Sequence, residues 1–317
     1  MSSTLRNVGL LGLGSHRPAN RVDNHGIAER TASSDEWIRE RSGIVTRGVA
    51  GEDESTVDMA VSAGGKALAA AGVPAEAVSL VLMATCSMPG PLPGGSPEVA
   101  HRLGARHAGA SDIGAGCAGF TYALSMAADA VRCSSADYVL VIGSEKLTPM
   151  VDPDDRATAF LFGDGAGAAV VGPTAADGIS RVVWAHDGEQ HDMLTIHGSP
   201  SRLAMNGRAI YRWATTSLPD LARRACEQAG IETHDLAAFV PHQANLRITE
   251  SVVKSLGLPA SVVVARDVVD SGNTSAASVP IALTRLHEEG TIRQGDPVLL
   301  LGFGAGLTAA GQVVRCP

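Results

Sequence analysis

One cysteine stands between small residues in the stretch DIGAGCAGFTYALSMAADAV, residues 112–131. Gly116 and Gly119 flank Cys117, and the small, apolar residues that follow are typical of a buried helix. Unpaired N–H groups and aligned peptide dipoles at a helix N-terminus favour a thiolate, so we expect this position to lower the pKa of Cys117. The same N–H groups can stabilise the oxyanion that forms when a thioester carbonyl is attacked. Taken by itself, the motif is more typical of a buried structural cysteine.

Two polar residues nearer the C-terminus could complete a site around this thiol. His242 follows Pro241 at the end of a short apolar run in VPHQANLRI, where a strand of an α/β fold would end and catalytic groups often gather. Asn273 begins the small-residue segment NTSAAS, which is similar to the segment around Cys117. Each residue alone is equally well explained as a packed histidine and as a capping or turn asparagine. Their matching positions predict that they converge on one site with Cys117.

A duplicated pattern must position these residues. KALAAAGVPAEAVSLVLMATCS (66–87) and RACEQAGIETHDLAAFVPHQAN (224–245) both predict a helix that ends at glycine, a short connector and an apolar strand. Segments 114–145 and 271–306 both predict a small-residue elbow, a helix, a polar loop and a strand that is apolar throughout. Such strands are expected where helices cover both faces of a sheet.

The repeated pattern predicts an α/β fold built from two similar halves. We expect an N-terminal half, residues 1–172, that carries the cysteine, and a C-terminal half, residues 173–317, that carries the histidine and the asparagine. The polar segment VGPTAADG (171–178) is the expected crossover between them.

Composition excludes several classes of protein. A chain of 317 residues that is 45% hydrophobic and 18% charged is globular. Its formal charge of −8 argues against nucleic acid or an anionic membrane as partner, because both favour a basic surface. No leader segment or long apolar run is present, so we expect a cytoplasmic protein. The five cysteines lack CxxC spacing and the ten histidines lack HExxH spacing, so neither a disulfide framework nor a metal site is expected.

Six motifs in order resemble one known family, β-ketoacyl-acyl carrier protein synthase III (ketosynthase III) of the thiolase superfamily. The similarity runs over nearly all of the chain. The motifs are SSDEWIRERSGI (33–44), GCAGFTYALSMAADAV (116–131), FGDGAGAAVV (162–171), VPHQANLRI (240–248), GNTSAASVPIAL (272–283) and GFGAGLT (302–308).

The resemblance implies a thiolase-like, five-layered αβαβα fold and a homodimer. It implies a decarboxylative Claisen condensation of an acyl-CoA starter with malonyl-acyl carrier protein, which gives a 3-oxoacyl-acyl carrier protein and initiates fatty-acid or polyketide synthesis. No cofactor is implied, since the CoA thioester is a substrate.

The resemblance also implies roles for residues of the reaction centre. Cys117 would be the acylated nucleophile, and His242 and Asn273 would donate hydrogen bonds to the malonyl thioester carbonyl. Phe303 would cap the decarboxylation site. The backbone N–H groups of Cys117 and Ala305 would form the oxyanion hole, although the family often has glycine at the second position.

A CoA site and a carrier surface are implied as well. Trp37 and Arg41 would hold the adenine, with Arg156 and Arg247 near the phosphates. Without the resemblance, these residues would be read as surface packing and solvated charge. A basic surface for an acidic carrier protein is expected on the segment after Met205 and behind His242, from Arg208, Arg212, Arg223, Arg224, Arg247 and Lys254.

Departures from the family pattern leave the starter undetermined. Val45 stands where another arginine is frequent, Arg208 stands where asparagine is frequent, and residues 187–205 form a short segment. The loop 85–97, which walls the acyl pocket in the family, is rich in proline and glycine. Two other functions stay open at this point: an acyltransferase that uses the same Cys-His site without decarboxylation, and a non-catalytic scaffold with the thiolase fold.

Overall fold

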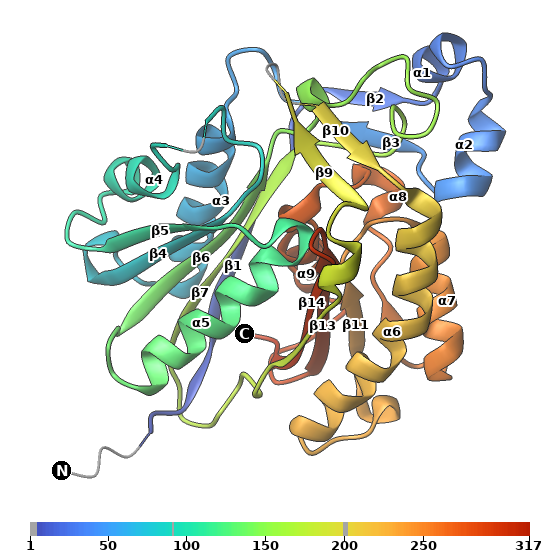
Figure 1. Ribbon diagram of the computed structural model, residues 1–317. Helices are drawn as coiled ribbons and strands as arrows, with labels where there is room; N and C mark the ends of the chain where they lie inside the picture. Colours follow the sequence, from blue (N-terminus) through green and yellow to red (C-terminus); the bar gives the residue numbers. More distant parts are fainter. Residues whose placement is uncertain (1–4, 91, 199–201) are drawn as a thin grey trace.

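The computed structural model describes residues 5–90, 92–198 and 202–317 and contains two five-stranded sheets (Figure 1). In spatial order, the first sheet consists of β1 (Val8–His16), β7 (Gly165–Pro173), β6 (Tyr138–Glu145), β4 (Val78–Ala84) and β5 (Gly109–Ile113). The second consists of β12 (Val263–Val264), β11 (Ala238–Pro241), β13 (Pro297–Gly304), β14 (Thr308–Arg315) and β8 (Val183–His186).

Strand directions repeat between the two sheets. In the first, β4 is parallel to β5 and β6, and β7 is antiparallel to β6 and β1. In the second, β11 is parallel to β12 and β13, and β14 is antiparallel to β13 and β8. The strands β6 and β13 are buried along almost their whole length, as their uniformly apolar sequences predicted. The prediction of two similar α/β halves is confirmed.

Helices complete five layers, which confirms the predicted αβαβα architecture (Figure 1). The outer face of the first sheet packs against α3 (Thr56–Ala71) and α4 (Ser96–Leu103). The layer between the sheets consists of α5 (Gly119–Arg132) and α9 (Ser278–Glu288). The outer face of the second sheet packs against α6 (Gly207–Gln228) and α7 (Leu246–Leu256). Small residues dominate the inner helices because two sheets must approach them closely.

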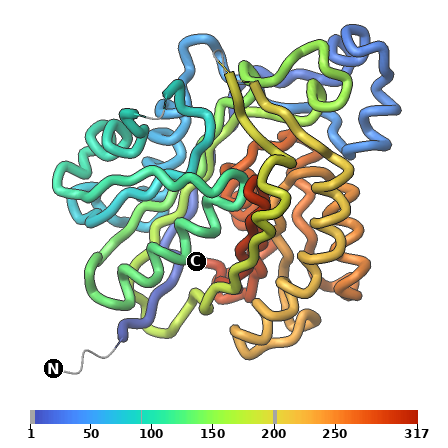
Figure 2. Tube along the Cα trace, in the orientation of Figure 1, coloured from blue at the N-terminus to red at the C-terminus, as the bar shows by residue number. Residues whose placement is uncertain are grey.

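One segment of the N-terminal half crosses to the other half. It contains β2 (Arg21–Asp23), α1 (His25–Arg30), α2 (Asp35–Ser42) and β3 (Thr46–Gly48). In Figure 2 this blue segment lies beside the orange helices of the C-terminal half, where α2 contacts α7 and β3 contacts α8 (Val268–Ser271). The buried Arg47 anchors the segment, since its guanidinium donates to Asn24 Oδ1 and to the Phe160 carbonyl oxygen. The crossing brings residues of both halves together on one surface.

The remaining elements are short. A hairpin of β9 (Leu194–His197) and β10 (Arg202–Met205) packs Leu203 and Met205 against a cluster that includes Leu147 and Phe160. The 3-10 turns are η1 (Ala75–Ala77), η2 (Gly116–Ala118), η3 (Thr148–Met150), η4 (Gly188–Gln190), η5 (Thr233–Asp235) and η6 (Ser275–Ala277).

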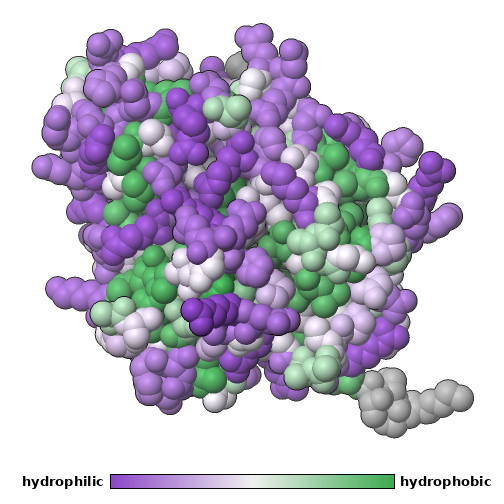
Figure 3. All heavy atoms as spheres, turned by 180° about the vertical axis from the view of Figure 1, so that it is seen from behind, coloured by the Kyte–Doolittle hydropathy of each residue, from purple (hydrophilic) through white to green (hydrophobic). Residues whose placement is uncertain are grey.

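The surface agrees with a globular chain. Hydrophilic side chains cover most of the face seen from behind, with smaller apolar patches between them (Figure 3). Among the described residues, none of the helices combines the length and the apolar character needed to cross a bilayer.

The strands of the first sheet end at Pro173 and those of the second begin at Val183. The division of the chain into units 1–172 and 173–317 stays a prediction.

Candidate active site

The two helices of the inner layer begin with the same backbone geometry. Cys117 lies in η2, which continues directly into α5, and the corresponding turn η6 continues into α9. The first residue of each turn has a left-handed φ, +51° at Gly116 and +48° at Ser275. Glycine adopts this conformation at little cost, whereas at Ser275 the surrounding structure must hold it. The structure thus places Cys117 at a helix start, where the sequence predicted it.

Each of these turns packs against a glycine of the opposite sheet. A Cβ placed on Gly304 of β13 would lie 2.8 Å from the backbone nitrogen of Cys117, closer than packed atoms allow. A Cβ placed on Gly143 of β6 would overlap the carbonyl oxygen of Ala276. Because glycine leaves this space free, the start of α5 reaches the second sheet and the start of α9 reaches the first. Both turns therefore meet in the middle of the molecule.

His242 directly follows β11 and is held against β13. Its backbone N–H donates to the Leu301 carbonyl oxygen at 2.7 Å, which continues the parallel pairing of the two strands. Its imidazole meets the ring of Phe303 edge to face, with centroids 5.0 Å apart and an interplanar angle of 70°. Phe303 precedes Gly304, the residue packed on Cys117. One strand end therefore positions both His242 and Cys117.

Asn273 lies just before η6 and is held by the N-terminal half. Its backbone N–H donates to the Leu161 carbonyl oxygen at 2.9 Å, and its carbonyl accepts from the Gly163 N–H at 3.0 Å. Its side-chain Oδ1 accepts a hydrogen bond from the Ser275 N–H at 2.8 Å. Since this bond uses the amide oxygen, the Nδ2 group is the free end, and it has no acceptor within the described residues. The side chain is oriented as a hydrogen-bond donor.

The protonation of Cys117 differs from the sequence-based expectation. Burial raises the pKa of the Cys117 thiol to about 12, and the Ser275 hydroxyl acts weakly in the opposite direction. The expected lowering of this pKa is therefore wrong for the free protein, because removal of the sulfur from water outweighs the helix terminus. The resting group is a thiol, and its proton has to leave when the sulfur attacks a substrate.

Burial acts on the pKa of His242 in the direction that keeps the ring neutral. The imidazole is 2% exposed, and burial lowers its pKa from 6.5 to about 3. A neutral imidazole has one N–H donor and one acceptor nitrogen. At neutral pH His242 can donate a hydrogen bond without carrying a charge.

A cavity of about 320 Å³ opens beside Cys117. Near the sulfur it is lined by Gly116, Ser275 and Ala305, and its remaining wall is largely apolar. That wall consists of Thr85, Cys86, Gly114, Leu147, Phe162, Leu194, Thr195, Ile196 and Leu203. The residues that line this cavity do not include His242, Asn273 or Phe303. The arrangement suits an apolar group attached to the sulfur, with the two polar donors outside its binding space.

A second thiol in this wall was not singled out by the sequence. The Cys86 sulfur lies 3.3 Å from Glu145 Oε1 and 3.8 Å from the hydroxyl of Ser275. Glu145 is fully buried and also accepts hydrogen bonds from the Cys86 N–H and from the Ser87 hydroxyl. Burial and the charge of Glu145 raise the pKa of Cys86 well above its usual value. Cys86 is thus held as a thiol that donates to a carboxylate.

The four residues predicted to contact CoA come together on the crossing segment and its neighbours. The Arg41 and Arg156 guanidinium carbons lie 4.5 and 4.8 Å from the centroid of the Trp37 ring. The Arg247 guanidinium lies 5.7 Å from the ring of Tyr211. A cavity of about 750 Å³ is lined by Trp37, Arg41, Arg247 and Tyr211 among others. Flat aromatic faces beside arginines suit a nucleotide base and its phosphates.

A helix cap joins the two halves at this cavity. Asn245 caps α7 by accepting from the Arg247 N–H at 2.9 Å, and its Nδ2 donates to the Arg41 carbonyl oxygen at 3.0 Å. The start of α7 and the end of α2 are therefore tied together, which holds Arg41 and Arg247 on one rim.

The sequence indicated no role for Tyr211, and it indicated Arg208 as a departure from the family pattern and as part of the basic surface for the carrier protein, not as part of the CoA site. Both line the CoA-sized cavity, together with Arg212 and Thr215. These positions follow a spacing of i, i+3, i+4 and i+7, which places them on one face of α6. That spacing in the segment after Gly207 is the signal that would have found them.

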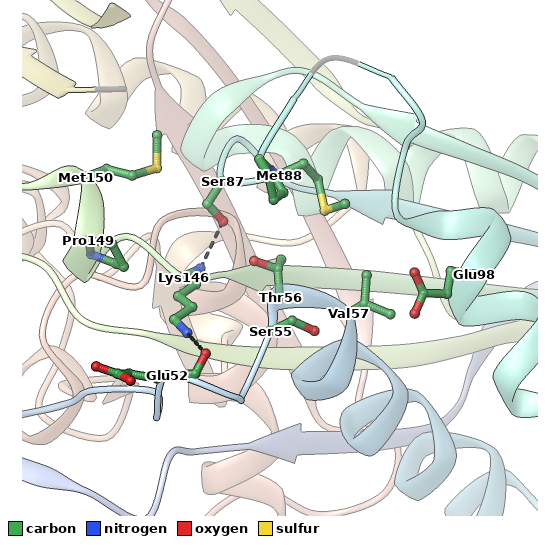
Figure 4. Close-up of a pocket in the computed structure, with 11 residues that line it drawn as sticks. Glu52, Ser55, Thr56, Val57, Ser87, Met88, Glu98, Lys146, Pro149 and Met150 are labelled. Carbon is green, nitrogen blue, oxygen red and sulfur yellow. Dashed lines mark hydrogen bonds between the residues drawn. The ribbon is translucent and has the colours of Figure 1, made fainter. Parts of the chain in front are cut away.

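A separate cavity of about 530 Å³ contains none of the predicted site residues (Figure 4). Its wall includes Ser87, Met88, Lys146 and Met150. The Lys146 ammonium donates to the carbonyl oxygens of Gly51, Glu52 and Glu54, so its three hydrogens are already used. Nowhere in residues 5–90, 92–198 and 202–317 do three or more His, Cys, Asp or Glu side chains gather as metal ligands would.

Comparison with known proteins decides the family. Residues 111–188 match the family model for 3-oxoacyl-[acyl-carrier-protein (ACP)] synthase III, and residues 226–316 match the model for its C-terminal part. β-Ketoacyl-[acyl-carrier-protein] synthase III 4 of Streptomyces coelicolor is 50% identical over 308 residues, which cover 96% of this chain and 97% of that protein. The chain belongs to the β-ketoacyl-[acyl-carrier-protein] synthase III family.

Solved structures of synthase III enzymes have the same fold. The priming β-ketosynthase of the R1128 polyketide pathway superposes with a TM-score of 0.98 at 44% identity, covering 100% of this chain and 98% of that chain. The synthase III of Aquifex aeolicus VF5 superposes with a TM-score of 0.93 at 35% identity, covering 98% and 100%. The predicted family, fold and enzyme class are confirmed: the protein is a condensing enzyme and an acyltransferase.

Proposed function

We propose that this enzyme condenses an acyl-CoA starter with malonyl-acyl carrier protein and releases CO₂ and a 3-oxoacyl-acyl carrier protein. The observation that supports this most strongly is the pair of neutral donors: His242 is packed on Phe303 of β13, and Asn273 lies just before η6, the turn that contacts the Cys117 turn. A simple acyl transfer to an alcohol or amine needs no such pair, because no enolate forms in it. A scaffold would need neither the donors nor the cavity beside the thiol.

In the first half-reaction the Cys117 sulfur attacks the thioester carbonyl of acyl-CoA. The acyl group moves to Cys117, and CoA leaves with the proton of the thiol. Backbone N–H groups of Cys117 and Ala305 stabilise the intermediate oxyanion. The Ala305 nitrogen lies 3.3 Å from where a Cβ on Gly116 would stand, so this N–H is close to the elbow.

In the second half-reaction the malonyl thioester loses CO₂ and becomes an enolate. Its oxygen accepts hydrogen bonds from His242 and Asn273, and its carbon attacks the carbonyl of acyl-Cys117. The bond to sulfur breaks, and the released thiolate takes a proton from solvent. Neutral donors in a water-poor site stabilise the enolate without protonating its carbon. Phe303, packed on the His242 ring, excludes water from this side.

CoA would bind across the cavity that joins the two halves. We propose that the adenine stacks on Trp37 with Arg41, and that Arg156 and Arg247 neutralise the phosphates. Tyr211 provides a second aromatic face there.

A homodimer, a cytoplasmic location and the absence of nucleic-acid or membrane partners stay predictions. β5 forms the edge of the first sheet and therefore offers unpaired backbone groups for a second copy.

We expect acylation on Cys117 alone when the protein is incubated with a panel of acyl-CoAs. Cys86 lines the same cavity, but its thiol is engaged by the Glu145 carboxylate, whereas Cys117 lies at the start of a helix with backbone N–H groups that can hold the oxyanion. Intact mass and peptide mapping will measure one added acyl group and its position. The Cys117→Ala variant should take up none, and its remaining thiols serve as the internal control. A label on Cys86 in the native protein would contradict the assignment of the nucleophile.

The carrier surface can be tested by reversing charges on α6 and α7. The sequence pointed to Arg212 and Arg223, but Arg212 lines the CoA cavity, so its reversal would also disturb loading. Arg223 and Lys254 are exposed, and the Arg223 guanidinium donates to the Ser255 carbonyl oxygen of α7. Their combined change to Glu should raise KM for the malonyl carrier about tenfold, reduce its salt dependence and leave acyl-CoA loading intact.

A matched control reverses two exposed arginines elsewhere, Arg181 and Arg293. It changes the net charge equally and should leave KM for the carrier within about twofold. Equal effects of the two double variants would place the docking surface elsewhere.

A further inference from the structure

Ser278 contacts the Nδ1 atom of the His242 imidazole, and the sequence motifs assigned it no role. It is the first residue of α9 and is 1% exposed. Its hydroxyl oxygen lies 2.6 Å from His242 Nδ1. The backbone N–H of Gln243 donates to the same oxygen at 3.2 Å.

The hydrogens of the Gln243 N–H and the Ser278 hydroxyl determine which group donates to His242 and which accepts. A backbone N–H can only donate, so the Ser278 oxygen accepts from Gln243 and its own hydrogen must find another partner. Within the described part of the chain, His242 Nδ1 is the one acceptor that the Ser278 hydroxyl reaches. A buried hydroxyl hydrogen without an acceptor is costly, so Ser278 donates to Nδ1. In a neutral imidazole that accepts at Nδ1, the hydrogen is carried by Nε2.

The neighbouring residue holds this arrangement in place. The side-chain Nε2 of Gln243 donates to the Pro241 carbonyl oxygen at 2.7 Å, and its Oε1 accepts from the Val268 N–H at 3.1 Å. Both ends of the amide are used, and Gln243 is 1% exposed. The Gln243 backbone N–H therefore has little freedom to turn away from Ser278.

We propose that Ser278 is a positioning residue that selects the Nε2–H tautomer of His242. This rests on the proposed function, in which His242 donates a hydrogen bond to the enolate oxygen. With the hydrogen on Nε2, the ring presents a donor to the malonyl thioester. The same nitrogen is then unable to take the proton of the Cys117 thiol. Ser278 should therefore support decarboxylation and leave acyl capture unaffected.

The first test measures the tautomer in the native protein. The protein is labelled with ¹⁵N-histidine, and an NMR spectrum that detects one-bond N–H coupling shows which ring nitrogen of His242 carries the hydrogen. The spectrum of the His242→Asn variant lacks the His242 signals and so assigns them. We expect the hydrogen on Nε2. A hydrogen on Nδ1 would overturn the proposal, whatever the activity of the enzyme.

The second test separates the half-reactions. In the Ser278→Ala variant the rate of CO₂ release from malonyl carrier protein should fall at least about tenfold. The fall should not exceed the roughly 10²–10³-fold loss expected when a donor to the enolate oxygen is deleted. Acylation of Cys117 should stay within about twofold. Ser278→Thr keeps the hydroxyl and should restore most of the rate. Thr284→Val is the matched control, because Thr284 is a buried hydroxyl of the same helix that bonds to the Pro280 carbonyl oxygen.

The outcomes distinguish this inference from the proposed function. Unchanged CO₂ release in a folded Ser278→Ala protein, or an equal loss of acylation, would overturn the role of Ser278. If the native protein released no CO₂ at all, the proposed function would fail, while the spectrum would still report the tautomer.

Discussion

The Cys117→Ala variant will form no 3-oxoacyl product and will still release CO₂ from malonyl carrier protein. Condensation should fall by at least about 10⁴-fold, because Cys86, the second thiol of the cavity, is engaged by Glu145 and does not replace the nucleophile. Decarboxylation should persist because His242 and Asn273 keep their positions: their contacts run to β13, to residues 161–163, and to Ser275 and Ser278, and none of them uses the cysteine sulfur. Radiolabelled CO₂ release and product mass are the two measurements.

The control for this variant removes a thiol elsewhere. Cys226 is buried on α6, outside the cavity, and Cys226→Ala should retain both half-reactions. Loss of CO₂ release in a folded Cys117→Ala protein that still binds malonyl thioester would show that capture and decarboxylation are not separate tasks.

His242→Ala and Asn273→Ala should show the reverse behaviour. Each removes one donor to the enolate oxygen, and loss of such a donor costs roughly 3–4 kcal/mol, or about 10²–10³ in the rate of CO₂ release. Acylation of Cys117 should survive at least in part, since the oxyanion in that step is stabilised by backbone N–H groups. Acyl-enzyme mass and CO₂ release, measured on each variant, will test this division.

The pH dependence provides an independent check on His242. Because burial lowers its pKa to about 3, the native ring stays neutral between pH 5 and 8, and the rate of CO₂ release should not follow a histidine titration there. Normal decarboxylation by His242→Ala would show that His242 is not a donor to the enolate oxygen and that this division of tasks is wrong.

The order of elements could be predicted from local patterns. Glycine stops, apolar strands and small-residue elbows depend on residues within a few positions of each other, so segments 66–87 and 224–245 were recognisable as repeats. The same is true of the elbow at Cys117, whose left-handed Gly116 is a local requirement. The matching left-handed Ser275 was not predictable, because its conformation is held by contacts with Asn273 and with the opposite half.

Burial by residues far away in the sequence determines the protonation of the side chains in the site. The sequence showed a helix start at Cys117, which favours a thiolate, but only the folded chain shows that this residue is buried and that the pKa of its thiol rises. Cys86, which lines the cavity beside Cys117, contacts Glu145 for the same reason, since β4 and β6 are neighbours only in the sheet.

The sequence by itself determined the family, the two-fold repetition of the fold and the identity of Cys117, His242 and Asn273 as candidates, because these depend on residue types in a fixed order. The tertiary structure decided which atoms are available: the free Nδ2 of Asn273, the tautomer of His242 set by Ser278, and the aromatic and arginine cluster shared between two halves. Such properties depend on burial and on hydrogen bonds between residues far apart in the chain, and these exist only after the sheets and helices have packed.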